Sequence, residues 1–302
     1  MTCDAGPCTH LYVKGGGQVP HRERRTAGLS FDMFESCRIG NVVIGPGQPL
    51  CIIAGPCALE SVDLCLRIGE TVGAACERLG LTYIFKASFD KANRSSVSSE
   101  RGPGVEQGLR DLSTIRDRLG VPVTTDIHER GQAALAAEHV DLLQIPAFLC
   151  RQTDLLAAAA ATGRPVNVKK GQFLSPAEMK HVVRKLDEAC CTNMMLTERG
   201  TFFGYHRLVN DFIGLGDLME IGPPVCFDAT HSTQLPGATE TSGGRPERAP
   251  LLARAAVAAG VHCIFLECHP EPGTALSDAS NMLPLDEVAP LLASLEAIRE
   301  AL

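Results

Sequence analysis

Short runs of apolar and β-branched residues alternate along the chain with longer segments in which apolar positions recur every three to four residues. The short runs are typical of buried strands, and the longer segments are typical of amphipathic helices. A glycine follows several helical segments, as expected at a helix end. The predicted strands are 50–54, 82–85, 121–125, 142–145, 165–168, 194–196, 225–227 and 261–266. The predicted helices are 61–79, 105–119, 131–138, 153–161, 176–189, 205–219, 246–259 and 285–302.

Eight strand–helix units in succession predict a parallel sheet closed into a (β/α)8 TIM barrel, a fold of ~250 residues. The 302-residue chain therefore fits a single α/β barrel domain with a short additional segment. A doubly wound open sheet is the alternative. It is not favoured, because no predicted strand is followed by the glycine fingerprint of a dinucleotide site. The glycines at 102–108 follow a serine-rich loop and indicate a turn into a helix.

The start of the chain lacks this alternation. Residues 1–37 are rich in Gly, Arg and His and predict a flexible N-terminal arm. Turn residues at 40–41 and 45–47, on either side of an apolar stretch, predict a β-hairpin before the first barrel strand. We therefore expect an arm at 1–37 and a barrel domain with an N-terminal hairpin at 38–302.

Composition excludes several classes of function. The formal net charge is −7, which argues against a nucleic-acid-binding protein because such proteins present a basic surface. No stretch approaches the ~18 consecutive apolar residues of a membrane helix. The N-terminus lacks the apolar core of a secretory signal, so we expect a cytoplasmic protein. Its thirteen cysteines are then interpreted mainly as reduced core residues.

Charged or metal-capable side chains stand where the predicted strands end. In a parallel barrel these C-terminal strand ends form one face, which carries the catalytic groups. One such residue is commonly a solvated strand end, but stability alone does not explain the whole set. The set comprises Cys57, Lys86, Asp126, Lys169, Arg199, His231, Glu267 and His269.

One part of this face is predicted to be cationic, although the protein as a whole is acidic. Its members are Lys86, Lys91, Arg94, Lys169 and Arg199. Like charges gathered at one place repel unless an anion neutralises them, so phosphate or carboxylate groups are the expected ligands. The loop at 91–96 adds amide and hydroxyl donors to this set.

A second part has the donor atoms of a metal site. Cys57, His231, Glu267 and Asp278 supply a thiolate, an imidazole and two carboxylates, although no local spacing joins them. A barrel brings the ends of strands one, seven and eight together, because strand eight pairs with both of the others. Such mixed ligands suit Zn²⁺, Fe²⁺ or Mn²⁺. The alternative for Cys57 is a small buried residue after a Gly-Pro turn.

Several long segments together match a known family. They are IAGPCALES (53–61), FKASFDKANRSS (85–96), LQIPAFLCRQTDL (143–155), NVKKGQF (167–173), TERGTFFGY (197–205), FDATHSTQLPG (227–237), SGGR (242–245) and ECHPEPGTALSDAS (267–280). From about residue 38 onward the chain closely resembles the 3-deoxy-D-manno-octulosonate 8-phosphate synthases. The related 3-deoxy-D-arabino-heptulosonate 7-phosphate synthases share the barrel and the Gly-Pro-Cys turn, but carry a Lys-Pro-Arg-Thr-Ser type segment at the position of 91–96.

The resemblance implies condensation of phosphoenolpyruvate with arabinose 5-phosphate and release of phosphate, a transferase reaction of lipopolysaccharide biosynthesis. As a hypothesis on the mechanism, we expect Asp126 and His231 to steer protons near the attacking water. With Lys169 they form the expected catalytic set. The phosphoenolpyruvate grip implied by the resemblance is Lys86, Ser88, Lys91, Lys169 and Arg199. The sugar phosphate is expected at Asn93, Arg94 and Ser95, and Gln234 and Ser242 complete the expected substrate-binding set.

The resemblance also implies a metal and an assembly. Cysteine at position 57 marks the metal-dependent kind of the family, with His231, Glu267 and Asp278 as the other ligands. Arg151 corresponds to an arginine that reaches a neighbouring subunit's site, so we expect a homotetramer. Two alternatives remain: a heptulosonate synthase, and a catalytically inactive barrel that binds sugar phosphate.

Overall fold

Eight parallel strands form a closed barrel in the computed structural model, which describes residues 35–92, 101–202, 206–236 and 243–302. Each strand pairs with the next one in chain order, and the last pairs with both its predecessor and the first, which closes the barrel. The predicted (β/α)8 TIM barrel is confirmed. Its strands are β3 (Cys51–Gly55), β4 (Thr82–Lys86), β5 (Val123–Asp126), β6 (Leu142–Ile145), β7 (Val166–Lys169), β8 (Met194–Glu198), β11 (Val225–Asp228) and β14 (Cys263–His269).

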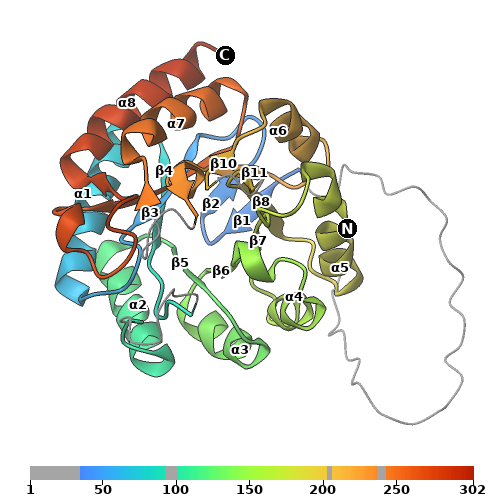
Figure 1. Cartoon of the computed structure of the whole chain (residues 1–302). Helices are drawn as coiled ribbons and strands as arrows, with labels where there is room; N and C mark the ends of the chain where they lie inside the picture. Colours follow the sequence, from blue (N-terminus) through green and yellow to red (C-terminus); the bar gives the residue numbers. More distant parts are fainter. Residues whose placement is uncertain (1–34, 93–100, 203–205, 237–242) are drawn as a thin grey trace, which may run out of the picture.

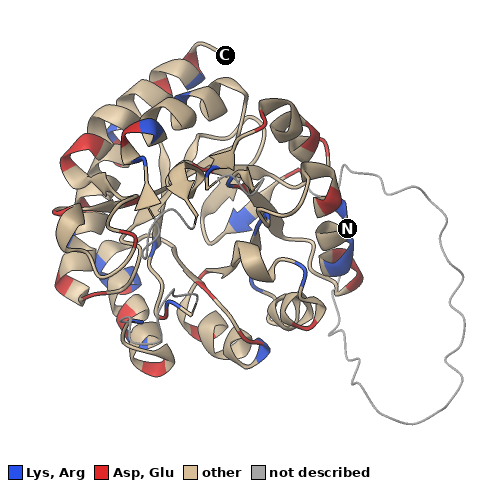
Figure 2. Ribbon diagram, in the orientation of Figure 1, with Lys and Arg blue, Asp and Glu red and all other residues tan. Residues whose placement is uncertain are grey.

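Helices surround the strands as an outer ring (Figure 1), and charged residues of both signs are distributed around that ring (Figure 2). The ends of the first helix show how the sequence sets such bounds. Ser61 accepts a hydrogen bond from the backbone N–H of Leu64, and Gly80 ends the helix in the left-handed region, at φ +68°. The helices are α1 (Val62–Leu79), α2 (Val105–Leu119), α3 (Arg130–His139), α4 (Thr153–Ala160), α5 (Met179–Glu188), α6 (Phe212–Met219), α7 (Ala249–Ala258) and α8 (Leu285–Glu300).

The helix predicted over 205–219 is wrong at its start. Helix α6 begins at Phe212, and β10 (Leu208–Val209) precedes it, antiparallel to β9 (Thr201–Phe202). The Asp211 side chain accepts a hydrogen bond from the Ile213 N–H and so caps the helix. The apolar residues of β10 continue the helical spacing of α6, which explains the error.

The loops contain several 3₁₀ turns and short strands. The helices predicted from 176 and from 246 each start with a 3₁₀ turn, η3 (Pro176–Glu178) and η5 (Pro246–Arg248). The other 3₁₀ turns are η2 (Ala147–Leu149), η4 (His231–Thr233) and η6 (Pro272–Thr274), and the other short strands are β12 (Gln234–Leu235), β13 (Gly243–Gly244) and β15 (Leu283–Pro284).

The core has two layers, one between strands and helices and one inside the barrel. The predicted hairpin is present as β1 (Cys37–Ile39) and β2 (Val42–Ile44). Its side chains Ile39 and Ile44 are fully buried and belong to the same cluster as the barrel interior residues Ile53 and Ile84. The hairpin therefore closes the N-terminal end of the barrel, and burial of each such side chain contributes about 1.5–3 kcal/mol.

Seven of the eight barrel strands extend one to three residues beyond their predicted C-terminal ends, and only β6 ends where predicted. Lys86, Asp126, Lys169 and Asp228 therefore lie inside strands rather than after them, and each is buried. Lys86, Lys169 and Asp228 remain in these strands because each meets a buried partner of opposite charge. Asp126 differs, because its side chain pairs with Ser88 and with the partly buried His128.

Candidate active site

A tight turn after β3 places Cys57 against the end of β4. Gly55 passes so close to β4 that a Cβ atom there would overlap the Lys86 carbonyl oxygen. The turn then continues the pairing between the two chain segments, because Leu59 N–H donates to the Ser88 carbonyl (2.9 Å) and Ser88 N–H to the Cys57 carbonyl (3.3 Å). Glycine at position 55 is therefore required by close packing of the two backbones.

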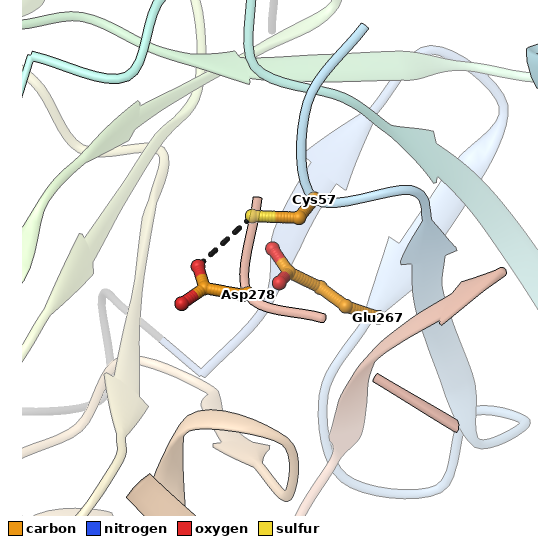
Figure 3. A group of neighbouring side chains, drawn as sticks. All are labelled: Cys57, Glu267 and Asp278. Carbon is orange, nitrogen blue, oxygen red and sulfur yellow. Dashed lines mark hydrogen bonds between the residues drawn. The ribbon is translucent and has the colours of Figure 1, made fainter. Parts of the chain in front are cut away.

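Cys57, Glu267 and Asp278 form one cluster, drawn in Figure 3, although they come from three distant parts of the chain. Their ligand atoms all lie within 4.8 Å of one another. The Cys57 thiol donates to Asp278 Oδ2 at 3.0 Å. Asp278 has a φ of +50°, a strained conformation for a residue with a Cβ, and such strain is often found at functional sites.

His231 lies beside this cluster. Its Nε2 is 3.6 Å from Glu267 Oε2, while its Nδ1 is 2.8 Å from Asp228 Oδ2. Asp228 also accepts a hydrogen bond from the His231 backbone N–H at 2.9 Å, so the carboxylate fixes the imidazole at two points. A carboxylate on one ring nitrogen is the usual support of a metal-binding histidine.

The donor set fits a divalent metal ion. Among the described residues Glu267 Oε2 is buried and has no hydrogen-bond partner, and it faces the His231 ring. A buried carboxylate oxygen without a partner is costly, so a ligand is expected there. The structure brings Cys57, Glu267 and Asp278 together and His231 to their edge, and binding of a metal by all four remains a prediction.

Burial and charge set the protonation of the cluster. Burial raises the pKa of the Cys57 thiol well above its ordinary value, and the charge of Glu267 raises it further. Burial also opposes ionisation of Glu267, but Lys86 and His231 outweigh it and lower the pKa of that carboxyl. A cation at the cluster reverses the balance for Cys57, because the thiolate is the form that binds metals.

Two of the predicted cations have buried carboxylate partners. Lys86 Nζ donates to Glu267 Oε1 at 2.7 Å, and Lys169 Nζ donates to Asp228 Oδ2 at 2.5 Å. The Phe265 ring lies beneath both, 3.6 Å from Lys169 Nζ and 5.4 Å from Lys86 Nζ. The expectation that a bound anion is needed to neutralise the cations is therefore wrong for Lys86 and Lys169, because carboxylates of the barrel already neutralise both.

Arg199 retains an unused donor. Its Nη2 donates to Gln234 Oε1 at 2.6 Å, and Gln234 Nε2 donates to Asp278 Oδ1 at 3.4 Å. Within the described residues the Arg199 Nε–H is buried and has no acceptor. Leaving such a donor unpaired costs about 1–3 kcal/mol, which an anionic ligand would recover.

A second row of polar groups lies at the ends of β4 and β5. Lys91 Nζ donates to Ser88 Oγ at 2.9 Å, and Ser88 Oγ donates to Asp126. Burial opposes ionisation of Asp126, but a hydrogen bond from His128 and the charge of Lys91 outweigh it, and they hold the pKa well below its usual range. Asp126 is therefore an ionised carboxylate that can accept hydrogen bonds near the cations.

The remaining predicted residues differ in their outcome. Asn93, Arg94, Ser95 and Ser242 lie outside the described residues. Arg151 is exposed between η2 and α4, and its carbonyl oxygen accepts a hydrogen bond from Lys185. His269 contacts Glu60 at 3.8 Å and accepts the Glu271 N–H, so it has different partners from His231.

Sequence reasoning missed Asp228, Lys170 and Glu198. Asp228 joins Lys169 to His231, and the predicted strand stopped one residue before it. Its position three residues before His231 at a strand end was a usable signal. Lys170 and Glu198 are buried next to predicted site residues, but their sequence context is that of ordinary charged residues.

Comparisons with known proteins identify the relatives of this barrel. The DAHP synthetase I family model matches residues 23–302. The chain belongs to the DAHP synthetase I family. It is 55% identical over 260 residues to the 2-dehydro-3-deoxyphosphooctonate aldolase of Cyanothece sp., covering 86% of this chain and 95% of that protein.

Further relatives carry the same name. The protein of Synechococcus sp. is 54% identical, covering 85% of this chain and 91% of its own length. That of Desulfotalea psychrophila is 52% identical, covering 86% and 94%. The name is a synonym of 3-deoxy-D-manno-octulosonate 8-phosphate synthase, so the resemblance stated from the motifs is confirmed.

Proposed function

We infer that this chain condenses phosphoenolpyruvate with arabinose 5-phosphate and water, giving 3-deoxy-D-manno-octulosonate 8-phosphate and inorganic phosphate. The terminal methylene carbon of phosphoenolpyruvate forms a bond to the aldehyde carbon, water adds to the oxygen-bearing second carbon, and the bond from that carbon to the phosphate oxygen breaks. The observation that carries this assignment is identity above 50% to relatives named for this activity, over most of both chains.

Binding of two anionic substrates is the first task of the site. Lys169, Arg199 and Lys91 lie at the face where the strands end, and each has more N–H donors than the hydrogen bonds it donates to described residues. We assign the phosphoenolpyruvate phosphate and carboxylate to these groups together with Lys86 and Ser88. Holding both reactants in the reactive geometry turns a bimolecular reaction into an effectively unimolecular one. This lowers the activation free energy by up to ~7–11 kcal/mol.

Proton handling is the second task. Asp126 is ionised and buried, so it is suited to accept a hydrogen bond from the attacking water and to orient its protons. His231 is held at Nδ1 by Asp228, which leaves Nε2 directed at the cluster. We assign proton steering to these two side chains, and for His231 this role uses Nε2 and therefore alternates with binding of the metal at the same atom. The carboxylate of Asp228 also orients the Lys169 ammonium, so the two functions share one residue.

The four side chains Cys57, His231, Glu267 and Asp278 would hold the metal. When bound there, a Zn²⁺, Fe²⁺ or Mn²⁺ ion supplies Lewis-acid polarisation of an oxygen of the substrate or of water. Glu267 also accepts a hydrogen bond from Lys86, so the proposed metal ligands and the proposed substrate grip are in direct contact.

A homotetramer is part of the proposal. Exposed apolar side chains come from the consecutive loops after β6, β7 and β8 and from α6, and side chains of this kind support an interface. They are Phe148, Phe173, Phe202, Val209 and Ile213, with exposed fractions of 37–82%. Arg151 lies next to η2, which carries Phe148, so this face would bring it to a neighbouring subunit.

We also propose that the enzyme works in the cytoplasm, in lipopolysaccharide biosynthesis. The buried cysteines carry free thiols, as expected in a reducing compartment. No helix among the described residues is long and apolar enough to span a bilayer.

The substrate assignment is tested by phosphate release from phosphoenolpyruvate with two aldoses. We expect rapid release with arabinose 5-phosphate and release at least ~100-fold slower with erythrose 4-phosphate, a difference of about 2.7 kcal/mol. The reverse preference would indicate the heptulosonate synthase. Binding of arabinose 5-phosphate without phosphate release from either pair would indicate an inactive barrel.

A further inference from the structure

A buried ion pair lies directly behind the proposed phosphoenolpyruvate grip. Lys170 follows Lys169 in the chain, and Glu198 precedes Arg199. Lys170 Nζ is 3.4 Å from Glu198 Oε1, and the two side chains are only 0% and 4% exposed. Each grip residue therefore has a buried charged neighbour on its own strand end, and these neighbours meet each other.

The ammonium of Lys170 joins two loops. It donates to the carbonyl oxygens of Gly171 (3.3 Å) and Leu174 (3.1 Å) in the loop after β7. Its Nζ is also within hydrogen-bond distance of the Gly200 carbonyl (3.3 Å) and of Thr201 Oγ1 (3.2 Å) in the loop after β8, so three N–H groups are shared among four acceptors. One buried cation thus binds the two backbone segments that directly follow Lys169 and Arg199.

Glu198 determines how the chain leaves β8. Its Oε1 accepts the backbone N–H of Arg199 at 2.9 Å and that of Gly200 at 2.6 Å. Gly200 has a φ of +93°, a conformation that favours glycine, and the carboxylate holds this sharp change of direction. The bend sends the Arg199 side chain toward Gln234, to which its Nη2 donates at 2.6 Å.

Stability is a poor reason to keep this pair. A buried ion pair is often replaceable by apolar residues without loss of stability, because desolvation of both charges offsets their attraction. Burial lowers the pKa of Lys170, and Glu198 offsets part of that effect, as this account requires. Most hydrogen bonds of Lys170 and Glu198 go to backbone groups next to Lys169 and Arg199. The pair is therefore better explained by the positions of these two residues than by stability.

We propose that Lys170 and Glu198 are positioning residues, which hold Arg199 and Lys169 at the separation that the two anionic groups of phosphoenolpyruvate require. The proposal rests on the assignment of Lys169 and Arg199 to that substrate. It predicts a selective loss of phosphoenolpyruvate binding, because the groups proposed for the aldose belong to the loop after β4.

The experiment measures kcat and the KM of each substrate by phosphate release, for Lys170→Met and Glu198→Gln in the full-length enzyme. The expected result is a KM for phosphoenolpyruvate raised about 10-fold or more, with the KM for arabinose 5-phosphate changed less than about twofold. Lys180→Met, on the exposed face of α5, is the matched control and leaves all three constants unchanged. An unchanged KM for phosphoenolpyruvate, or an equal rise for both substrates, would overturn the proposal.

A double-mutant cycle separates positioning from general damage. In an Arg199→Ala background, Glu198→Gln should raise the KM for phosphoenolpyruvate less than about twofold, because there is no guanidinium left to position. A full additional 10-fold rise in that background would contradict the proposal. If Lys170→Met does not fold, the nearly isosteric Glu198→Gln decides both measurements.

The same variants distinguish failure of this proposal from failure of the substrate assignment. Arg199→Ala alone should raise the KM for phosphoenolpyruvate strongly. If it does not, the assignment of Arg199 to that substrate is wrong. If it does while Glu198→Gln has no effect, the grip stands and the positioning proposal fails.

Discussion

The two ends of the barrel interior are built from the same strands but have opposite character. At the N-terminal end the inward residues are apolar, as in Ile84 and Cys226, and the hairpin covers them. Two residues further along the same strands stand Lys86 and Asp228, which are buried but charged. Because strand residues two apart point the same way, one strand serves both the packed core and the site.

Cysteines make the difference clearest. Cys263 lies at the packed end in the same apolar cluster as Cys51 and Cys226, and burial together with those thiols raises its pKa. Cys57 lies at the other end between carboxylates, one of which accepts a hydrogen bond from its thiol at 3.0 Å. The same side chain is thus a core residue at one end and a proposed metal ligand at the other, and its neighbours decide which.

Replacing each of these cysteines separately by alanine gives the largest expected difference in metal binding and activity. Cys57→Ala should abolish metal binding and lower kcat by at least ~100-fold, because a ligand matters more than its supporting groups, whose loss typically costs 10–100-fold. Cys263→Ala should retain metal and activity. Metal content by elemental analysis and phosphate release measure both. Full activity of the wild-type enzyme after exhaustive chelation would contradict the metal-dependent assignment.

Shortening one buried side chain of the hairpin tests the apolar, N-terminal end of the barrel. Ile39→Ala removes a fully buried side chain, so the free energy of unfolding should fall by about 2–5 kcal/mol while kcat stays within about twofold. Urea unfolding and phosphate release on the same preparation measure the two quantities. A large loss of kcat in fully folded protein would show that the hairpin end influences the chemistry.

Asp228 tests the link between the cations and the proposed metal cluster. Asp228→Asn preserves shape but removes the charge that pairs with Lys169 and holds His231. We expect a ~10–100-fold loss of metal affinity or of kcat. Metal titration by calorimetry with the purified apo-enzyme measures the first quantity, and unchanged affinity and kcat together would remove Asp228 from the site.

The smallest expected effects concern pH, and the two ends should differ in sign. At the charged end, Asp126 and Asp228 have lowered pKa values, since the surrounding cations outweigh burial. The unfolded chain then binds more protons in acid, so the free energy of unfolding should fall as the pH drops below about 4. Urea unfolding between pH 3 and 7 measures this slope, and Asp126→Asn should flatten it.

At the packed end the buried thiols have raised pKa values, with burial as the main cause. The unfolded chain loses these protons first, so stability should fall as the pH rises above about 8.5. Cys263→Ala should flatten this alkaline slope and leave the acid slope unchanged. Equal changes of both slopes in either variant would mean that the two ends are not energetically distinct.

Much of this architecture could be predicted because it depends on local patterns. The eight strand–helix units follow from the periodicity, and all eight barrel strands were found. Errors arose where a local pattern was ambiguous, as at Leu208–Val209, whose apolar residues continue a helical spacing although they form a strand. The predicted strand ends lie too early in the chain, because charged residues such as Lys86 and Asp228 are not typical of buried strands.

The fold class, the family and the set of charged residues at the strand ends follow from residue identity and spacing along the chain. Which of these charges meet depends on the arrangement of the strands in space. Lys86 pairs with Glu267 across 181 residues and Lys169 with Asp228 across 59, and barrel closure brings each pair together. A buried cation is stable only beside a partner of opposite charge. The partner stands on the next strand but one, because β3 lies between β4 and β14, and β8 lies between β7 and β11.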